Sequence, residues 1–206
     1  SKQIFKNPLK QLFKVFKEEK IRKLSLAFFI YFIAFTGLTN ILIFFLQESL
    51  NWTTKASSGT LVVVGVIAII VQGGLIGPLV KRFGEMKLTL VGSGFILLAC
   101  FLLITAPQEN AIVNIYSAVS FLAVGAGLIT PTLRALISKK LDGDNQGSIL
   151  SNLQGLQSLG GVLGIGMAGR VYDDFGPKAP FIAGALILLF MIYLIAEGKN
   201  KNITYN

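Results

Sequence analysis

Residues 24–46 read LSLAFFIYFIAFTGLTNILIFFL, an apolar stretch interrupted only by small or uncharged polar residues. A helix needs about 17–25 such residues to cross a hydrocarbon core of about 30 Å. The stretch is too long for the apolar region of a signal peptide, and no small-residue cleavage site follows it. It therefore predicts a retained membrane-spanning helix.

Five further apolar blocks follow, at residues 60–80, 88–106, 112–133, 148–169 and 180–196. The chain is 53% hydrophobic and 14% charged, whereas soluble proteins are roughly a quarter charged. In lipid, only helices and closed barrels pair all their backbone groups, and no block alternates as a barrel strand would. We therefore expect an all-α membrane protein with six transmembrane helices within residues 24–196.

The basic residues indicate the topology. Sixteen of the 19 Lys and Arg residues lie before the first span, between the second and third, after the fourth or after the sixth. The exceptions are Lys55, Arg170 and Lys178. Since basic loops stay in the cytoplasm, both termini, including the tail at residues 197–206, are predicted to be cytoplasmic. The net charge of +9 then reflects topology rather than binding of nucleic acid.

Residues 1–23 combine lysines with apolar residues spaced one helical turn apart. The pattern predicts an amphipathic helix on the cytoplasmic membrane surface. A charged flank that only fixes topology would explain the lysines but not the spaced phenylalanines. The apolar set is Phe5, Leu9, Leu12 and Phe16.

Polar side chains form stripes on some spans, whereas the third and sixth blocks are uniformly apolar and are expected to face lipid. A lone amide in hydrocarbon is costly, so the stripes should face other helices or a wet cavity. For any single residue, an interhelical hydrogen bond is the competing interpretation. The first span carries Thr36, Asn40 and Gln47, and the fifth carries Gly147, Ser151, Gln154, Ser158 and Gly161.

Two glycine pairs, Gly73 with Gly77 and Gly160 with Gly164, have the spacing that lets helices approach closely. Arg170 precedes Asp173 and Asp174 by three and four residues, so these charges can pair if the helix continues.

The residue types also indicate what chemistry to expect. The chain has no histidine and one cysteine, Cys100, so no cysteine metal cage is expected. No Asp, Glu or Lys lies deep within a span, and Arg134, near the cytoplasmic end, is expected to snorkel. We therefore predict no catalytic residues, no metal site and no cofactor.

The segment GPLVKRFGEMK at residues 77–87 resembles the loop signature of the major facilitator superfamily, in its C-terminal-half copy. Gly77, Arg82, Gly84 and Lys87 match the pattern, while Lys81 occupies the family's acidic position. Gly84 is expected to adopt the positive φ of a tight turn between the two spans. The fourth and fifth spans, with GAGLITP at residues 125–131 and many glycines at 155–169, resemble tetracycline-efflux-like drug:proton antiporters. The Asn7-Pro8-Leu9 segment resembles the linker between the transporter halves.

This resemblance implies two inverted three-helix repeats, at residues 24–106 and 112–196. In the family, the first helix of each repeat lines the central cavity. The residues expected to contact solute are therefore Thr36, Asn40, Asn114 and Ser117, joined by Ser151, Gln154 and Ser158 of the polar stripe.

The family's working unit has twelve spans. Because the chain starts at Ser1 without a methionine, we expect a C-terminal fragment whose partner is an N-terminal six-helix half. A natural half-transporter that dimerises is the alternative. The expected function is transport of a small solute by alternating access, as proton-coupled efflux in a bacterial inner membrane. A nutrient or metabolite uptake carrier of the same superfamily, or a non-transporting membrane subunit, remains the alternative.

Overall fold

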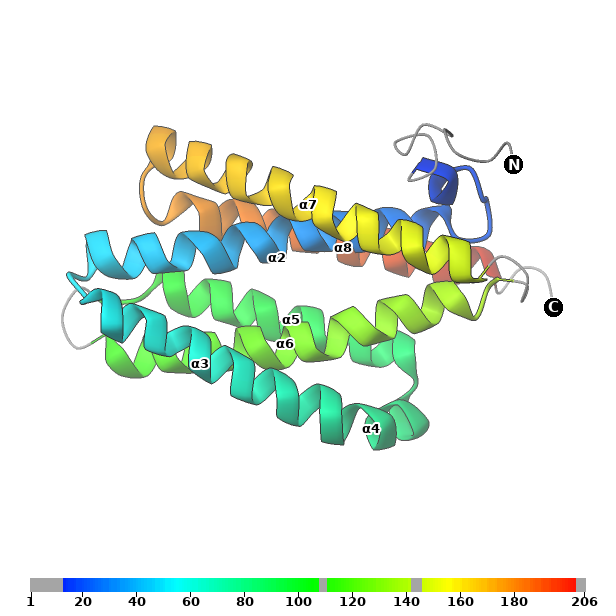
Figure 1. Ribbon diagram of the computed structural model, residues 1–206, viewed down its shortest axis with the longest axis horizontal. Coiled ribbons are helices and arrows are strands. Elements are labelled where there is room, and N and C mark those ends of the chain that lie inside the picture. Colours follow the sequence, from blue (N-terminus) through cyan, green and yellow to red (C-terminus); the bar gives the residue numbers. More distant parts are fainter. Residues whose placement is uncertain (1–12, 108–110, 142–145, 203–206) are drawn as a thin grey trace, which may run out of the picture.

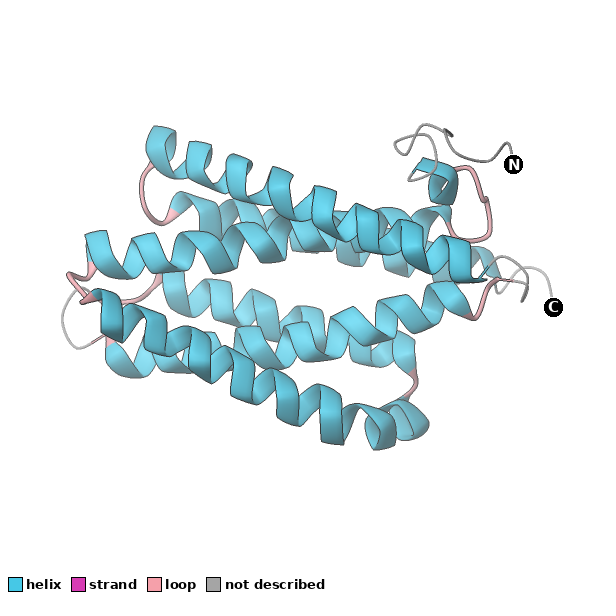
Figure 2. Ribbon diagram, viewed as in Figure 1, coloured by secondary structure: helices cyan, strands magenta, loops and turns pink. Residues whose placement is uncertain are grey.

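The computed structural model describes residues 13–107, 111–141 and 146–202, and these residues form helices joined by short loops (Figure 2). Most of the helices lie side by side along one long axis (Figure 1). The elements are η1 (Phe13–Phe16), α2 (Arg22–Ser49), α3 (Thr54–Ile70), η2 (Val71–Leu75), α4 (Ile76–Phe83), α5 (Glu85–Ile104), α6 (Ile112–Ser138), α7 (Gln146–Phe175) and α8 (Ala179–Asn202).

Among the described residues, five helices are long and apolar enough to cross a membrane, which supports a multi-pass membrane protein. The predicted span at 148–169 lies in α7, which is long enough but does not meet this measure. The glutamines, serines and charged last turn of α7 lower the mean hydropathy of this helix. The five helices are Arg22–Ser49, Thr54–Phe83, Glu85–Ile104, Ile112–Ser138 and Ala179–Glu197.

The second span is a single long helix with one irregular turn. α3, η2 and α4 follow one another without a break, and η2 is a π-helical turn with the sequence VQGGL. Such turns are single-turn bulges within α-helices. The helix stops at Gly84, whose φ of 77° confirms the predicted positive-φ turn, and α5 begins at the next residue.

The bundle consists of two groups of helices, one packed around α2 and the other around α6. α2 packs on α7 and α8, and α6 packs on α3 and α5. Contacts of α5 with α8 and of α2 with α6 join the two groups, which Figure 1 shows one above the other. The largest buried side chains include Phe28, Tyr31, Phe45, Phe181 and Ile96.

The apolar helices α5 and α8 each have a buried side and an exposed side. On α5, Cys100 is buried and Phe101 is exposed, and on α8, Met191 is buried and Phe190 is exposed. Both helices therefore contribute to the core as well as to the outer surface.

Glycines set the closest helix contacts. A Cβ atom at Gly164 would lie 2.2 Å from the Ile33 carbonyl oxygen of α2, and one at Gly160 would lie 3.1 Å from that of Phe29. This confirms close approach at the Gly160 and Gly164 pair. The prediction for Gly73 and Gly77 was wrong for the described part of the chain, because a Cβ atom at either position would have no neighbour within 4 Å.

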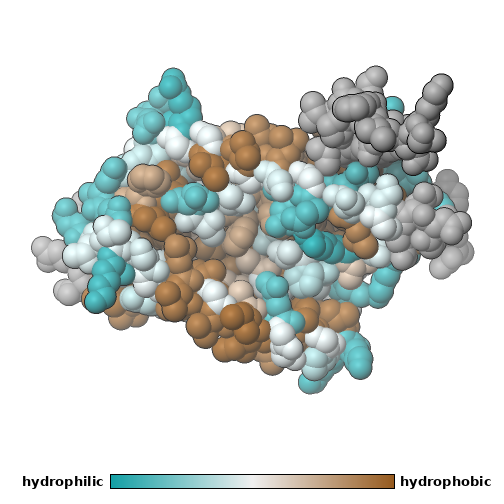
Figure 3. All heavy atoms as spheres, viewed as in Figure 1, coloured by the Kyte–Doolittle hydropathy of each residue, from teal (hydrophilic) through white to brown (hydrophobic). Residues whose placement is uncertain are grey.

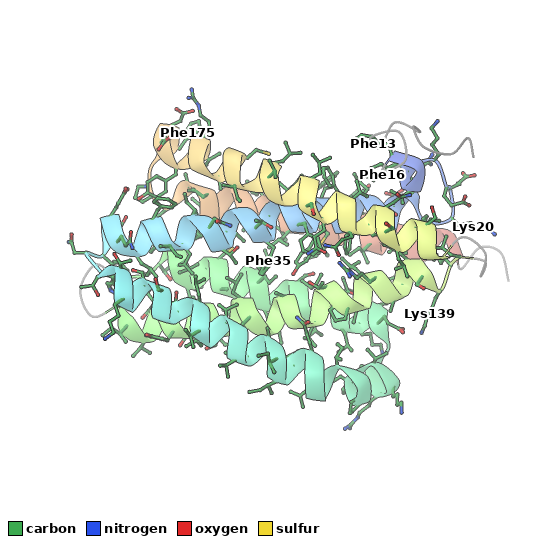
Figure 4. All side chains as sticks on the ribbon, in the orientation of Figure 1. Phe13, Phe16, Lys20, Phe35, Lys139 and Phe175 are labelled. Atoms are coloured by element: carbon green, nitrogen blue, oxygen red, sulfur yellow. The ribbon has the colours of Figure 1, made fainter. Side chains whose placement is uncertain are left out.

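Both described ends of the chain lie at the same end of the bundle, together with the turn at Gly84 (Figure 1). Lys23 pairs with Glu197 there at 2.6 Å, and Lys139 pairs with Glu85. At the opposite end, Figure 4 shows Phe175 in the last turn of α7.

Two polar contacts secure that opposite end. Arg170 pairs with Asp174 at 2.8 Å, which confirms the prediction that the helix continues and the charges pair. The Tyr172 hydroxyl donates a hydrogen bond to Glu48 at 2.8 Å and so links α7 to α2.

Only the last part of the predicted amphipathic helix at residues 1–23 is described, and Phe5, Leu9 and Leu12 lie outside it. The 3₁₀ helix Phe13–Phe16 is followed by a turn, and α2 begins at Arg22. The predicted helix therefore does not continue unbroken to residue 23. The Phe16 ring meets the Phe29 ring edge-on, with 6.3 Å between centroids, which holds this segment against α2.

Candidate functional site

An arginine lies at the junction of α2, α6 and α7. Arg134 donates hydrogen bonds from Nη2 to Oε1 of Gln154, at 2.8 Å, and to Oε1 of Gln157. Its guanidinium carbon lies 5.8 Å from the centre of the Phe28 ring. The expectation that Arg134 snorkels to the membrane surface was wrong, because its side chain is directed sideways to α7. We call Arg134, Gln154 and Gln157 the arginine cluster.

The arginine cluster lies inside the bundle rather than at its end. Gln154 is roughly 12 Å along α7 from the first residue of that helix, and Phe28 is roughly 9 Å along α2 from its start, at about 1.5 Å per residue. The Nε atom of Arg134 is buried without a hydrogen-bond partner among the described residues. None of the ion pairs found in the described part of the chain includes Arg134.

The two glutamines hold the guanidinium through their side-chain oxygens. They are three residues apart, so both side chains leave the same face of α7. Gln154 is exposed and Gln157 is half-buried, and the Ser158 hydroxyl donates to the Gln154 carbonyl at 3.2 Å. In Figure 3, hydrophilic side chains gather near the middle of the visible face, between α6 and α7, with apolar side chains around them.

Aromatic side chains lie further along α2. The hydroxyl groups of Tyr31 and Thr130 share a hydrogen bond of 3.3 Å between α2 and α6. The ring of Phe35 stacks on that of Tyr31, with centroids 5.6 Å apart. Figure 4 shows Phe35 near the middle of the bundle, in the band between α2 and α6. An apolar wall therefore continues from the arginine cluster toward the centre of the bundle.

The predicted cavity residues of α2 and α7 are spread along the bundle. Thr36 faces α7, since a Cβ atom at Gly161 would lie 3.6 Å from its hydroxyl oxygen. Asn40 is exposed, and its amide donates to the Thr36 carbonyl at 2.9 Å. Ser151 and Ser158 are exposed on α7.

The two candidates on α6 lie far from the arginine cluster. Asn114 and Ser117 are half-buried in the first turns of α6. Arg134 is roughly 25–30 Å further along the same helix. The structure thus brings Gln154 next to Arg134 but does not gather the seven predicted residues at one point.

The loop-signature residues lie at the end where α4 meets α5. Lys81 and Arg82 are exposed in the last turn of α4, and Lys87 is exposed in the first turn of α5. The Arg82 guanidinium carbon lies 5.2 Å from the centre of the Phe83 ring. Gly77 is exposed one turn before Lys81.

Sequence reasoning did not select Arg134, Gln157, Tyr31 or Thr130 as site residues. The spacing of Gln154 and Gln157 was the available signal for a shared partner on one face of α7. Among the described residues, no three His, Cys, Asp or Glu side chains gather closely enough to hold a metal ion.

A bundle of long apolar helices that contains a half-buried arginine and interhelical polar contacts is typical of a multi-pass membrane transporter rather than an enzyme. The family model described as Major Facilitator Superfamily matches residues 2–165. The chain belongs to the Major Facilitator Superfamily, which confirms the resemblance seen in the sequence.

The chain is similar to several resistance proteins. It is 26% identical over 159 residues to the tetracycline resistance protein, class C, of Escherichia coli, which covers 76% of this chain and 39% of that protein. It is 30% identical over 148 residues to the class D protein of Salmonella ordonez, covering 70% of this chain and 36% of the relative. Multidrug resistance protein 2 of Bacillus subtilis (strain 168) is 21% identical to this chain over 179 residues, which cover 85% of this chain and 44% of that protein. The chain spans about two fifths of the length of these relatives.

Proposed function

We propose that this chain is the C-terminal six-helix half of a transporter that exports a small solute by alternating access, driven by a proton gradient. The observation that carries the proposal is its membership of the superfamily together with its similarity to tetracycline and multidrug resistance proteins. The half-buried arginine and the polar contacts between α2, α6 and α7 support it, because intramembrane polar groups mark solute pathways.

The packing pattern supports a sixth span and two inverted repeats. We take α2, α3–α4 and α5 as one repeat, and α6, α7 and α8 as the other. The contact of α2 with α7 then has its counterpart in that of α6 with α3, and the contact of α2 with α8 in that of α6 with α5. This exchange of partners is what two equivalent three-helix units would produce. In this proposal α7 also crosses the membrane, with its polar side chains turned toward protein.

An N-terminal six-helix half is the partner that we propose for the face containing α3 and α7. On α3 the side chains of Val62, Val66 and Ile69 are more than half exposed. Gly73 and Gly77 have open space beside them. Small residues among apolar ones suit close helix packing in membranes, where no water drives association. Figure 3 shows apolar side chains gathered over α3 on this face.

With such a partner in place, the polar face between α6 and α7 would become one wall of a central cavity. We propose that Thr36, Asn40, Asn114, Ser117, Ser151, Gln154 and Ser158 line this wall along its length. The proton is carried by residues of the other half, and the basic end with Lys81, Arg82 and Lys87 faces the cytoplasm of a bacterial inner membrane.

The test is expression of the full-length protein, with the segment that precedes Ser1, in a bacterial strain that lacks its own drug exporters. We expect a raised minimal inhibitory concentration of tetracycline or another antibiotic, and accumulation of that drug in inverted membrane vesicles that a protonophore abolishes. The matched control is the 206-residue chain alone, which should confer no resistance. Accumulation of a nutrient by intact cells would instead identify an uptake carrier, and membrane insertion without any transport would favour a non-transporting subunit.

A further inference from the structure

The geometry points to the arginine cluster as a binding subsite for the carboxylate of a solute. This inference rests on the proposed transport function and names the chemical class of the solute. Nothing in the superfamily assignment or in the names of the relatives specifies an anion.

The first argument is the unbalanced charge. Gln154 and Gln157 are neutral, so their oxygens orient the guanidinium of Arg134 without neutralising it. None of the ion pairs found among the described residues includes Arg134. A cation held inside a helix bundle is most stable when an anion pairs with it.

The second argument is geometric. The two printed hydrogen bonds leave from Nη2 of Arg134, whereas a guanidinium carries five N–H donors. Its planar fork fits a carboxylate through two parallel hydrogen bonds, which a lysine cannot match. The side chain of Arg134 is half-buried, and its partner Gln154 is exposed, so a solute can approach the cluster from the exposed side of α7.

The third argument concerns the remainder of the solute. Phe35 lies seven residues after Phe28 on α2, which is roughly 10 Å along the helix. Its ring stacks on Tyr31 and lies near the middle of the bundle (Figure 4). A solute whose carboxylate meets Arg134 can therefore rest an apolar or aromatic body against this wall. The class is an amphipathic carboxylic acid.

The probes are 4-phenylbutyrate, which joins a carboxylate to an aromatic body through a short flexible chain, and its neutral amide, 4-phenylbutyramide. The measurement is the unfolding temperature of the purified full-length transporter in detergent, as a function of probe concentration. We expect the acid to raise the unfolding temperature and the amide to have no effect. This comparison needs no variant, so equal effects of acid and amide, or no effect of either, would overturn the inference.

Variants test whether Arg134 provides the contact. Arg134→Gln should weaken the apparent affinity for the acid by roughly 10–100-fold, as expected for loss of hydrogen bonds to a charged group. Arg134→Lys keeps the charge and should fall between that variant and the wild type. Lys140→Gln removes an exposed charge six residues further along the chain, just after the end of α6, and is the matched control, with unchanged affinity. A different pair of results would contradict the inference: Arg134→Gln destabilises the protein without ligand, and the wild type does not prefer the acid to the amide. Arg134 would then pair with a carboxylate of the transporter itself rather than with a solute.

The two proposals fail in different ways. A transporter that exports antibiotics but does not distinguish acid from amide would overturn this inference alone. A protein that binds the acid through Arg134 but transports nothing would overturn the proposed function alone.

Discussion

Replacing Gly164 by alanine should force α2 and α7 apart. The added Cβ atom would lie 2.2 Å from the Ile33 carbonyl oxygen and 3.1 Å from the Gly37 nitrogen. Favourable carbon contacts need about 3.5 Å, so the helices must separate locally by about 1 Å. Both obstructing atoms belong to the backbone and cannot rotate away as a side chain could.

Two opposing effects set the expected magnitude. Alanine is favoured over glycine within a helix by about 1 kcal/mol. Overpacking costs about 1–3 kcal/mol, and a clash with backbone belongs at the upper end of that range. The net loss is therefore about 2 kcal/mol, which lowers the unfolding temperature by a few degrees.

The matched control is Gly166→Ala. Gly166 lies two residues further along α7, where an added Cβ atom has no neighbour within 4 Å. It should leave the unfolding temperature unchanged or raise it slightly. Thermal unfolding of the detergent-purified full-length protein measures both variants. Equal unfolding temperatures for the two variants would refute the helix contact at Gly164.

Three further variants test other features by the same measurement. Gly84→Ala should cost about 1–3 kcal/mol, because Gly84 has φ 77° and ψ 157°, a region open almost only to glycine. Gly94→Ala, inside α5 where an added Cβ atom has no neighbour within 4 Å, should cost nothing and is the matched control. Thr132→Val removes the 2.8 Å hydrogen bond to Thr89 between α5 and α6 and should cost about 0.5–1 kcal/mol, and Thr132→Ser should retain most of that stability. Asp174→Asn breaks the exposed pair with Arg170 and should leave stability unchanged. A fall of several degrees in the unfolding temperature of this variant would show that the pair does more than join two residues of one helix.

Sequence reasoning succeeded where the signal is local. The apolar run at residues 24–46 predicted α2, because length and composition alone decide whether a helix can span a bilayer. Gly84 ends the second long helix at a positive φ, as its place in the loop predicted. Arg170 and Asp174 pair because both lie on one continuous helix.

Sequence reasoning failed where the outcome depends on which helix is the neighbour. The spacing of Gly73 with Gly77 equals that of Gly160 with Gly164, yet only the second pair meets another helix among the described residues. Because Arg134 lies near the end of α6, the sequence predicted that its side chain extends to the membrane surface. In the structure the guanidinium instead donates hydrogen bonds to Gln154 and Gln157 of α7.

The candidate site could be predicted only in part. The polar stripe on α7 led to Gln154, but it also made α7 too polar to pass as a membrane span by composition. The periodicity of a sequence indicates which residues share one face of a single helix, whereas a binding site is formed by the faces of several helices. Asn114 and Ser117 lie on α6, the helix that also carries Arg134, but near its opposite end. The seven cavity residues stay predictions.

The pairing of α2 with α7 and α8 has a consequence for biogenesis. The ribosome makes α2 long before its partners, since about 125 residues separate the middle of α2 from that of α7. At about 5–20 residues per second, the first helix waits roughly 6–25 s in the membrane before α7 emerges. During that interval Thr36, which faces α7 in the completed bundle, lacks that neighbour, so the newborn chain depends on the insertion machinery or on transient neighbours to shield its hydroxyl group. A ribosome stalled before residue 146 would therefore leave α2 without its main packing partner.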